Sequence, residues 1–205
     1  MGEAERDPAG TLGINPYAAP VLDEEDHEPR EAQAAEYSEY YVVALHKFYL
    51  LSVLTVGLYN LYWFYAQFRS QKRSGMKTNP ALAALFAIFT VHRLFRRLDR
   101  AAMRAGVTNS PHAIKQAWPY IGLGLLSQVL RAVGEHSMTL TAFSMIALVA
   151  TALPLGSVQK LVNRIADDPK GRSNATLSVV NIVAMALGGI FWVMAIFGFA
   201  MVTRI

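Results

Sequence analysis

The sequence contains no cysteine and few charged residues: none of its 205 residues is Cys, and 17% are Asp, Glu, Lys or Arg. The missing thiol excludes a disulfide framework, a thiolate metal site and a cysteine nucleophile. A soluble domain of this length usually carries about 25% charged residues. Together with the mean hydropathy of +0.26, the deficit of charge indicates lipid as the solvent for much of the chain.

Acidic residues are scarce outside the N-terminal segment. Residues 1–40 hold 11 of the 15 Asp and Glu and two of the 19 Lys and Arg, a net charge of −9, whereas the remainder carries +13. Residues 1–40 also contain four prolines and hardly any large aliphatic side chains, too little apolar area to offset the entropy of ordering. We therefore predict a disordered acidic tail over 1–40 and a basic, helical membrane domain over 41–205. No signal peptide is expected, because the first apolar run begins only at Phe48.

Four long apolar runs follow the tail, and each is near the roughly 20 residues that a bilayer core requires. A buried helix of a soluble protein is the alternative for any one run, but the rest of the chain is too short to cover four. The pattern predicts an all-α polytopic membrane protein. The expected spans lie near 48–66, 117–134, 138–158 and 177–202.

A fifth apolar run, over 80–91, has only 12 uncharged residues, about 18 Å as a helix against a core of about 30 Å. It is either a short re-entrant helix or a fifth span. Four spans place the tail outside, with 14 Lys and Arg inside and 5 outside; five spans place it inside, with 13 and 6. We favour four spans, because the bases from Arg69 to Lys77 lie directly beside a helix end.

Residues 92–105 read HRLFRRLDRAAMRA, an amphipathic basic helix in which four arginines fall on one stripe at 100° per residue. One interpretation is a helix lying on the inner leaflet, with its apolar face down and its arginines on anionic lipid headgroups. The other is ordinary topology-determining charge. Nucleic acid is not expected as a partner, because a recognisable fold and an aromatic platform are missing. The headgroup candidates are Arg93, Arg97, Arg100 and Arg104.

Three polar residues inside the expected spans are candidates for a role within the membrane: Gln128, Arg131 and Asn181. An ionisable residue within a bilayer is a functional hypothesis by default. Arg131, however, lies near a helix end, where a long side chain reaches the interface, and we favour that interpretation over an ion or proton relay.

Ala184 and Gly188 have the small-xxx-small spacing that lets helices approach closely, with Asn181 able to bond across the contact. Packing within the chain is favoured over homo-oligomerisation or contact with a partner membrane protein.

The catalytic inventory is poor. The five histidines are scattered without an i, i+4 pair suited to a metal, so we predict no catalytic residue, no metal site and no cofactor. We expect a non-enzymatic scaffold, subunit or regulator that contacts partner helices and anionic lipid. The alternative is a small transporter or channel, which calls for polar residues converging at the midplane or for an internal repeat. An enzyme acting on lipids ranks third.

Residues 47–65 read KFYLLSVLTVGLYNLYWFY, followed by Asn79-Pro80-Ala81-Leu82 and by Leu94-Phe95-Arg96-Arg97-Leu98. This stretch resembles the bacterial membrane family known as domain of unknown function 4234. The resemblance covers residues 47–98 specifically and the rest loosely. It implies a small multi-pass protein of the bacterial cytoplasmic (inner) membrane and supplies no catalytic residues.

Overall fold

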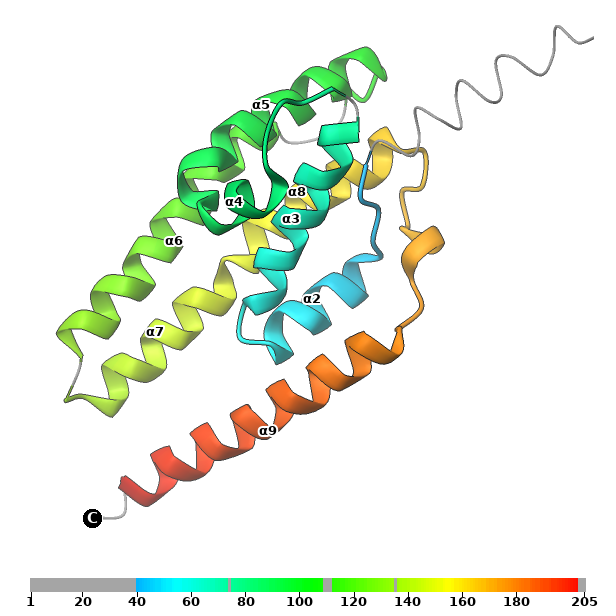
Figure 1. The fold of residues 1–205 in the computed structure, drawn as a ribbon. Helices are drawn as coiled ribbons and strands as arrows, with labels where there is room; N and C mark the ends of the chain where they lie inside the picture. The colour runs from blue at the N-terminus through cyan, green and yellow to red at the C-terminus, as the bar shows by residue number, and fades with distance from the viewer. Residues whose placement is uncertain (1–39, 74, 109–111, 135, 203–205) are drawn as a thin grey trace, which may run out of the picture.

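The structure is a computed structural model that describes residues 40–73, 75–108, 112–134 and 136–202. The predicted tail over 1–40 lies outside the described residues except for Tyr40. The described chain is helical and contains no strand (Figure 1), which confirms the all-α fold class. In chain order the helices are α2 (Leu45–Leu54), α3 (Leu58–Arg73), α4 (Pro80–Leu85), α5 (Ala87–Arg104), α6 (Ala113–Val133), α7 (Met138–Ala150), α8 (Ala152–Ile165), the short 3-10 helix η2 (Arg172–Asn174) and α9 (Val179–Val202).

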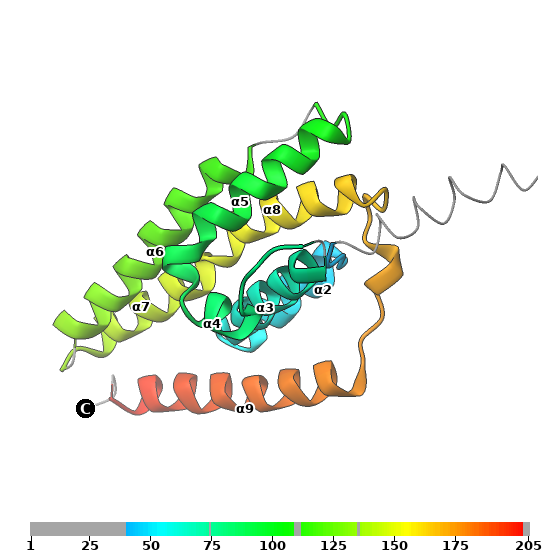
Figure 2. The same cartoon turned by 45° about the horizontal axis from the view of Figure 1, so that its top comes forward.

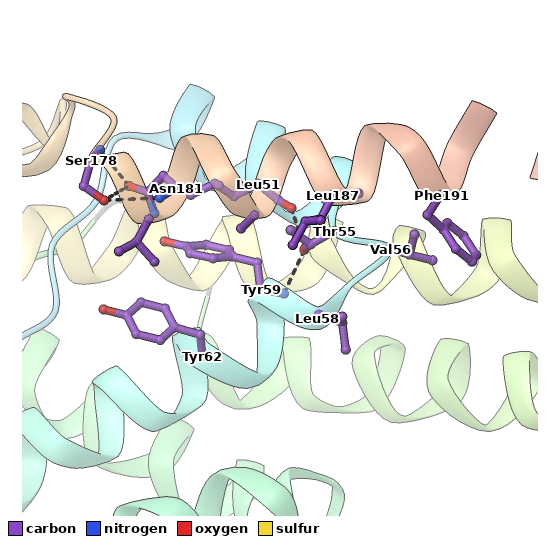
Figure 3. A pocket seen from close by; sticks show the side chains of 13 residues that line it. Leu51, Thr55, Val56, Leu58, Tyr59, Tyr62, Ser178, Asn181, Leu187 and Phe191 are labelled. Carbon is purple, nitrogen blue, oxygen red and sulfur yellow. Dashed lines mark hydrogen bonds between the residues drawn. The ribbon is translucent and has the colours of Figure 1, made fainter. Parts of the chain in front are cut away.

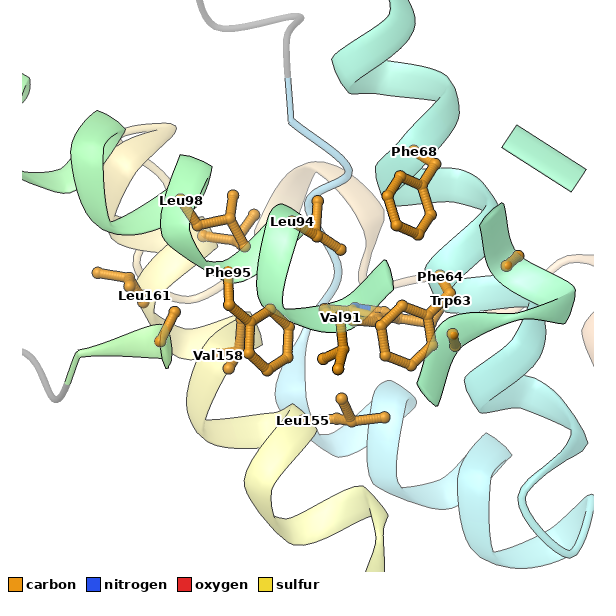
Figure 4. Packing of buried hydrophobic residues seen from close by; sticks show 14 of the residues in the cluster. Trp63, Phe64, Phe68, Val91, Leu94, Phe95, Leu98, Leu155, Val158 and Leu161 are labelled. Carbon is orange, nitrogen blue, oxygen red and sulfur yellow. The ribbon is translucent and has the colours of Figure 1, made fainter. Parts of the chain in front are cut away.

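The core lies where α3, α5 and α8 meet. Trp63 and Phe64 of α3, Phe95 of α5 and Leu155 of α8 are fully buried there, and Figure 4 shows their side chains converging from the three helices. The rings of Phe64 and Phe95 stack with centroids 6.4 Å apart. One buried apolar cluster joins α2, α3, α4, α5, α6 and α8, and α7 packs along α6. Helix α9 runs along the side of this body (Figures 1 and 2).

The span expected over 48–66 is wrong, because the chain reverses direction in the middle of that run. Helix α2 ends at Leu54 and α3 begins at Leu58, and Val56 and Gly57 both adopt positive φ, 52° and 81°. The reversal is closed by the Gly57 N–H, which donates to the Ser52 carbonyl at 2.8 Å. The run is therefore a hairpin of two short helices.

Two helical segments of the described chain are long and apolar enough to cross a membrane, rather than the four or five expected. They are Met138–Ile165, formed by α7 and α8 in succession, and Val179–Met201 of α9. Helix α6 has 21 residues, but its polar and ring-bearing side chains reduce its hydropathy below that of a typical span. Those side chains include Trp118, Pro119, Gln128 and Arg131.

The boundary expected between an apolar helix over 80–91 and a basic helix over 92–105 is also wrong. Helix α4 ends at Leu85, and α5 begins at Ala87 and continues without a break to Arg104. The short helix starts where Asn79 Oδ1 accepts from the backbone N–H of Ala81 and Leu82, at 3.0 and 3.3 Å. Neither α4 nor α5 is among the segments of the described chain that are long and apolar enough to cross a membrane.

The apolar side of α5 packs on protein, whereas one of the two interpretations of this helix placed that side on lipid. Val91, Leu94, Phe95 and Leu98 are all fully buried in the core. The sequence pattern correctly indicates an amphipathic helix, but hydrophobic periodicity alone does not tell whether protein or lipid covers its apolar side. The arginines of α5 are left on the outward side.

Candidate functional site

The two ends of the body differ in character, and contacts between distant segments define each of them. At one end, the segment 40–44 lies against the last turns of α8 and against η2. Asn163 Nδ2 donates to the Val43 carbonyl and Asn174 Nδ2 to the Val42 carbonyl, both at 2.9 Å. We call this the basic end, for the charges described below.

The opposite end is formed by the α6–α7 turn and the last turns of α9. Met138 and Thr141 of α7 line an apolar groove of about 420 Å³ together with Gly198 and Phe199 of α9. The C-terminal end of α9 therefore lies beside the α6–α7 turn, far from the segment 40–44 (Figure 1). We call this the turn end.

Positive charge gathers at the basic end in an open hollow between α5 and the loop that follows α3. Arg93, Arg97 and Arg100 line it together with Lys77, and its volume is about 360 Å³. These four residues define the basic hollow. The structure thus brings three of the four predicted headgroup candidates together and adds Lys77, which sequence spacing did not single out. Arg104 lies exposed in the last turn of α5, outside the lining of the hollow.

A second basic surface lies on the other side of the same loop. Arg69, Lys72 and Arg73 at the end of α3, with Tyr65 and Asn79, line a hollow of about 540 Å³. The two hollows flank residues 75–79. Among the described lysines and arginines, Arg131 is the one that lies near the turn end.

Two described carboxylates at the basic end bind backbone N–H groups. Asp99 accepts from the N–H of Ala113 at 2.6 Å and of Ile114 at 3.0 Å, so that it caps α6. Asp168 accepts from the N–H of Ser173 at 2.8 Å and of Arg172 at 2.9 Å. These hydrogen bonds hold the pKa of Asp168 below its ordinary value of 3.8, and the bond from the Ser173 N–H has the largest effect. Both carboxylates therefore accept hydrogen bonds from backbone N–H groups and stabilise local structure.

A buried polar network fixes the segment 40–44 in place. Gln159 and Asn163 of α8 are fully buried. Gln159 accepts from Trp63 Nε1 and donates to the Tyr41 carbonyl at 3.2 Å. Asn163 binds Val43 as described above. Sequence patterning missed this network, because isolated Gln and Asn within an apolar run do not reveal their partners.

Lys47, in the first turn of α2, is also buried at this end. Its Nζ donates to Asn174 Oδ1 at 2.6 Å and to the Thr176 carbonyl at 2.7 Å. The Lys47 side chain thereby ties α2 to the loop between α8 and α9.

Two of the three predicted polar residues of the spans, Gln128 and Arg131, bind each other, and Asn181 lies apart from them. Arg131 donates to Gln128 Oε1 at 3.0 Å on an exposed face near the end of α6. Asn181 lies in the first turn of α9, where its Oδ1 accepts from the N–H and hydroxyl of Ser178 at 3.1 and 2.9 Å. Glu135, four residues after Arg131 in the sequence, lies outside the described residues. Asn181 thus bonds to the start of its own helix.

Gly188 packs within the chain. A Cβ built at Gly188 would lie 1.9 Å from the Leu54 carbonyl oxygen, and Trp192 Nε1, one turn later, donates to the Val53 carbonyl at 2.9 Å. Ala184 lines an apolar groove of about 870 Å³ between α9 and the α2–α3 hairpin. Figure 3 shows Tyr59 and Tyr62 facing α9 across this groove.

Comparison of the chain with family models, with curated proteins and with solved structures finds no match. Among the described residues, no three His, Asp or Glu gather in a group suited to a metal ion. The function is therefore inferred from the arrangement of charged and apolar surfaces in the structure.

Proposed function

We propose that the chain is a multi-pass protein of the bacterial inner membrane that acts without catalysis, as a scaffold, subunit or regulator contacting lipid and partner helices. The observation that carries the proposal is the segregation of charge. The basic residues gather at one end of a body that has two segments long and apolar enough to cross a membrane. Helix α9 is apolar around its whole circumference and almost wholly exposed, a pattern that suits lipid surroundings.

The path of the chain gives three crossings in this proposal. If α7–α8 and α9 cross, the α6–α7 turn is on the side opposite the basic end. Helix α6 must then cross as well, because its first turn is capped by Asp99 of the basic end. Three crossings place the first described residues and the end of α9 on opposite sides. The positive-inside tendency assigns the basic end to the cytoplasm.

The α2–α3 hairpin and the α4–α5 bend enter the membrane only part of the way in this proposal. Leu58 at the hairpin turn and Phe89 near the start of α5 are 72% and 79% exposed, which suits contact with lipid chains. Because Arg93 follows Phe89 by one helical turn, the basic hollow lies at the headgroup level. Anionic headgroups are its expected lipid partners.

Reconstitution in vesicles tests this lipid contact. Phosphatidylglycerol added to phosphatidylcholine vesicles should raise the unfolding temperature of the native chain more than that of an Arg93→Gln, Arg100→Gln double variant. Arg131→Gln, which removes a charge near the turn end, is the matched control and should keep the full gain. Equal gains for all three proteins would contradict headgroup binding at the basic hollow.

The transporter alternative has less support. The buried amides of α3 and α8 bind one another and the backbone, an arrangement that fixes the fold. The same vesicles, loaded with an ion-sensitive dye, provide the discriminating measurement. A flux that the native chain supports and that empty vesicles lack would favour the transporter.

A further inference from the structure

The basic hollow faces away from the body. The other side of α5 is fully buried, with Leu94 and Leu98 in the core, so the helix cannot rotate to hide its arginines. The charge of this surface suits an acidic partner, and such a partner can approach from the aqueous side as well as from the leaflet. The positive charge of the hollow thus restricts its occupant to a negatively charged group.

The carboxylates of Asp99 and Asp168 are engaged elsewhere in the described fold. Both oxygens of Asp99, the acidic residue of α5 itself, bind backbone N–H groups of α6. Asp168 likewise binds its own loop. The acids of the chain are concentrated elsewhere, with 11 of 15 in residues 1–40 and five of those in residues 23–28.

The acidic segment is joined to the body at the basic end, where the basic hollow lies. The chain enters the described fold at Tyr40, and the following residues bind α8 and η2 at the basic end. The 12 residue steps from Glu28 to Tyr40 extend to at most about 40 Å. The whole of α5, with 18 residues, is only about 27 Å long. A tether of this length gives an effective concentration near the millimolar range.

We propose that residues 23–28 dock on the basic hollow and compete there with anionic lipid headgroups. The docked segment screens Lys77, Arg93 and Arg100 from the leaflet, and a high density of anionic lipid displaces it. The inference rests on the proposed function, because it needs the tail on the same side of the membrane as the basic end. The pairing is electrostatic and requires no fixed conformation of the tail.

Cross-linking in the cysteine-free chain tests the docking. We would place one thiol in the acidic segment with His27→Cys and another on α5 with Met103→Cys, a side chain that is 68% exposed. A short bismaleimide should join this pair efficiently in phosphatidylcholine vesicles at low salt. The matched control pair keeps His27→Cys and moves the second thiol to the turn end with His136→Cys.

Two changes should abolish the cross-link. Replacing the five acids of residues 23–28 by Asn and Gln should reduce its yield to that of the control pair. Molar salt should do the same, because the screening length falls from about 10 Å at 0.1 M to about 3 Å. Added phosphatidylglycerol should lower the yield by competition. A yield equal to the control pair with the native tail, or one unchanged by neutralisation, would overturn the docking.

Labelling of the same His27→Cys thiol separates this inference from the proposed function. If a membrane-impermeant maleimide reaches it in intact spheroplasts, the tail is outside and the proposed topology fails together with the docking. If the thiol is protected but gives no specific cross-link, the topology stands and the docking alone fails. The basic hollow would then bind lipid without competition from the tail.

Discussion

Gly188 of α9 lies directly against the carbonyl oxygen of Leu54, the last residue of α2. The approach is so close that a Cβ at position 188 would lie 1.9 Å from that oxygen. Helix α9 touches the body mainly here, and Trp192 adds a hydrogen bond to the neighbouring Val53 carbonyl. The end of the short helix α2 is thus the main attachment point of the long apolar helix α9.

Gly188→Ala should detach α9 from α2 or force the two helices apart, at a cost of about 1–3 kcal/mol as for other overpacked sites. The matched control is Gly189→Ala, one residue along the helix, where a Cβ meets nothing within 4 Å. That change should be neutral or stabilising by up to about 1 kcal/mol through helix propensity. Thermal unfolding in detergent measures both. Equal effects of the two substitutions would contradict the close contact.

Asn163→Ala should release the segment 40–44 from α8. The substitution leaves the Val43 carbonyl without its partner and removes one of the two hydrogen bonds that the Gln159 amide donates. A buried unpaired group costs about 1–3 kcal/mol. Amide hydrogen exchange at residues 43 and 44 should accelerate more than exchange in α5. Ser157→Ala on the same helix, whose hydroxyl bonds only within that helix, serves as the control. Unchanged exchange in Asn163→Ala would refute the anchoring role.

Asp168 should make the loop before α9 sensitive to acid. Its backbone bonds hold the pKa below 3.8, whereas the unfolded chain has the ordinary value. The stabilisation is therefore complete above about pH 4 and is lost as the pH falls through the lower folded value. Asp168→Asn should weaken the loop at neutral pH and flatten the stability profile below pH 4. A native profile as flat as that of the variant would refute this linkage.

The sequence predicts the helical class and the long apolar segment of α9, because 31 uncharged residues permit few alternatives. It does not predict the hairpin over 48–66. Val56 at positive φ breaks the usual preference of a β-branched residue, so no local signal other than Gly57 marked the turn. A mean hydropathy taken over the whole run stays high on both sides of the turn, so it does not reveal that the chain reverses direction.

The candidate site was predicted only in part. The arginine stripe of α5 follows from 100° spacing, but Lys77 joins it through the tertiary arrangement of the loop after α3. The topology could not be settled from charge counts, because the run over 48–66, counted there as one span, is a hairpin of two helices. Once α2–α3 is a hairpin, almost all described basic residues fall at one end.

The position of the two ends of the body relative to the membrane tests the central claim most directly. Ala4→Cys places a single thiol in the acidic tail, and His136→Cys places one at the exposed α6–α7 turn. Each variant would be treated in intact spheroplasts with a membrane-impermeant maleimide, with lysed cells as the positive control. We predict labelling at position 136 and protection at position 4 until lysis. Labelling at position 4 with protection at position 136 would contradict the proposed topology, and equal labelling of both would contradict a body that crosses the membrane.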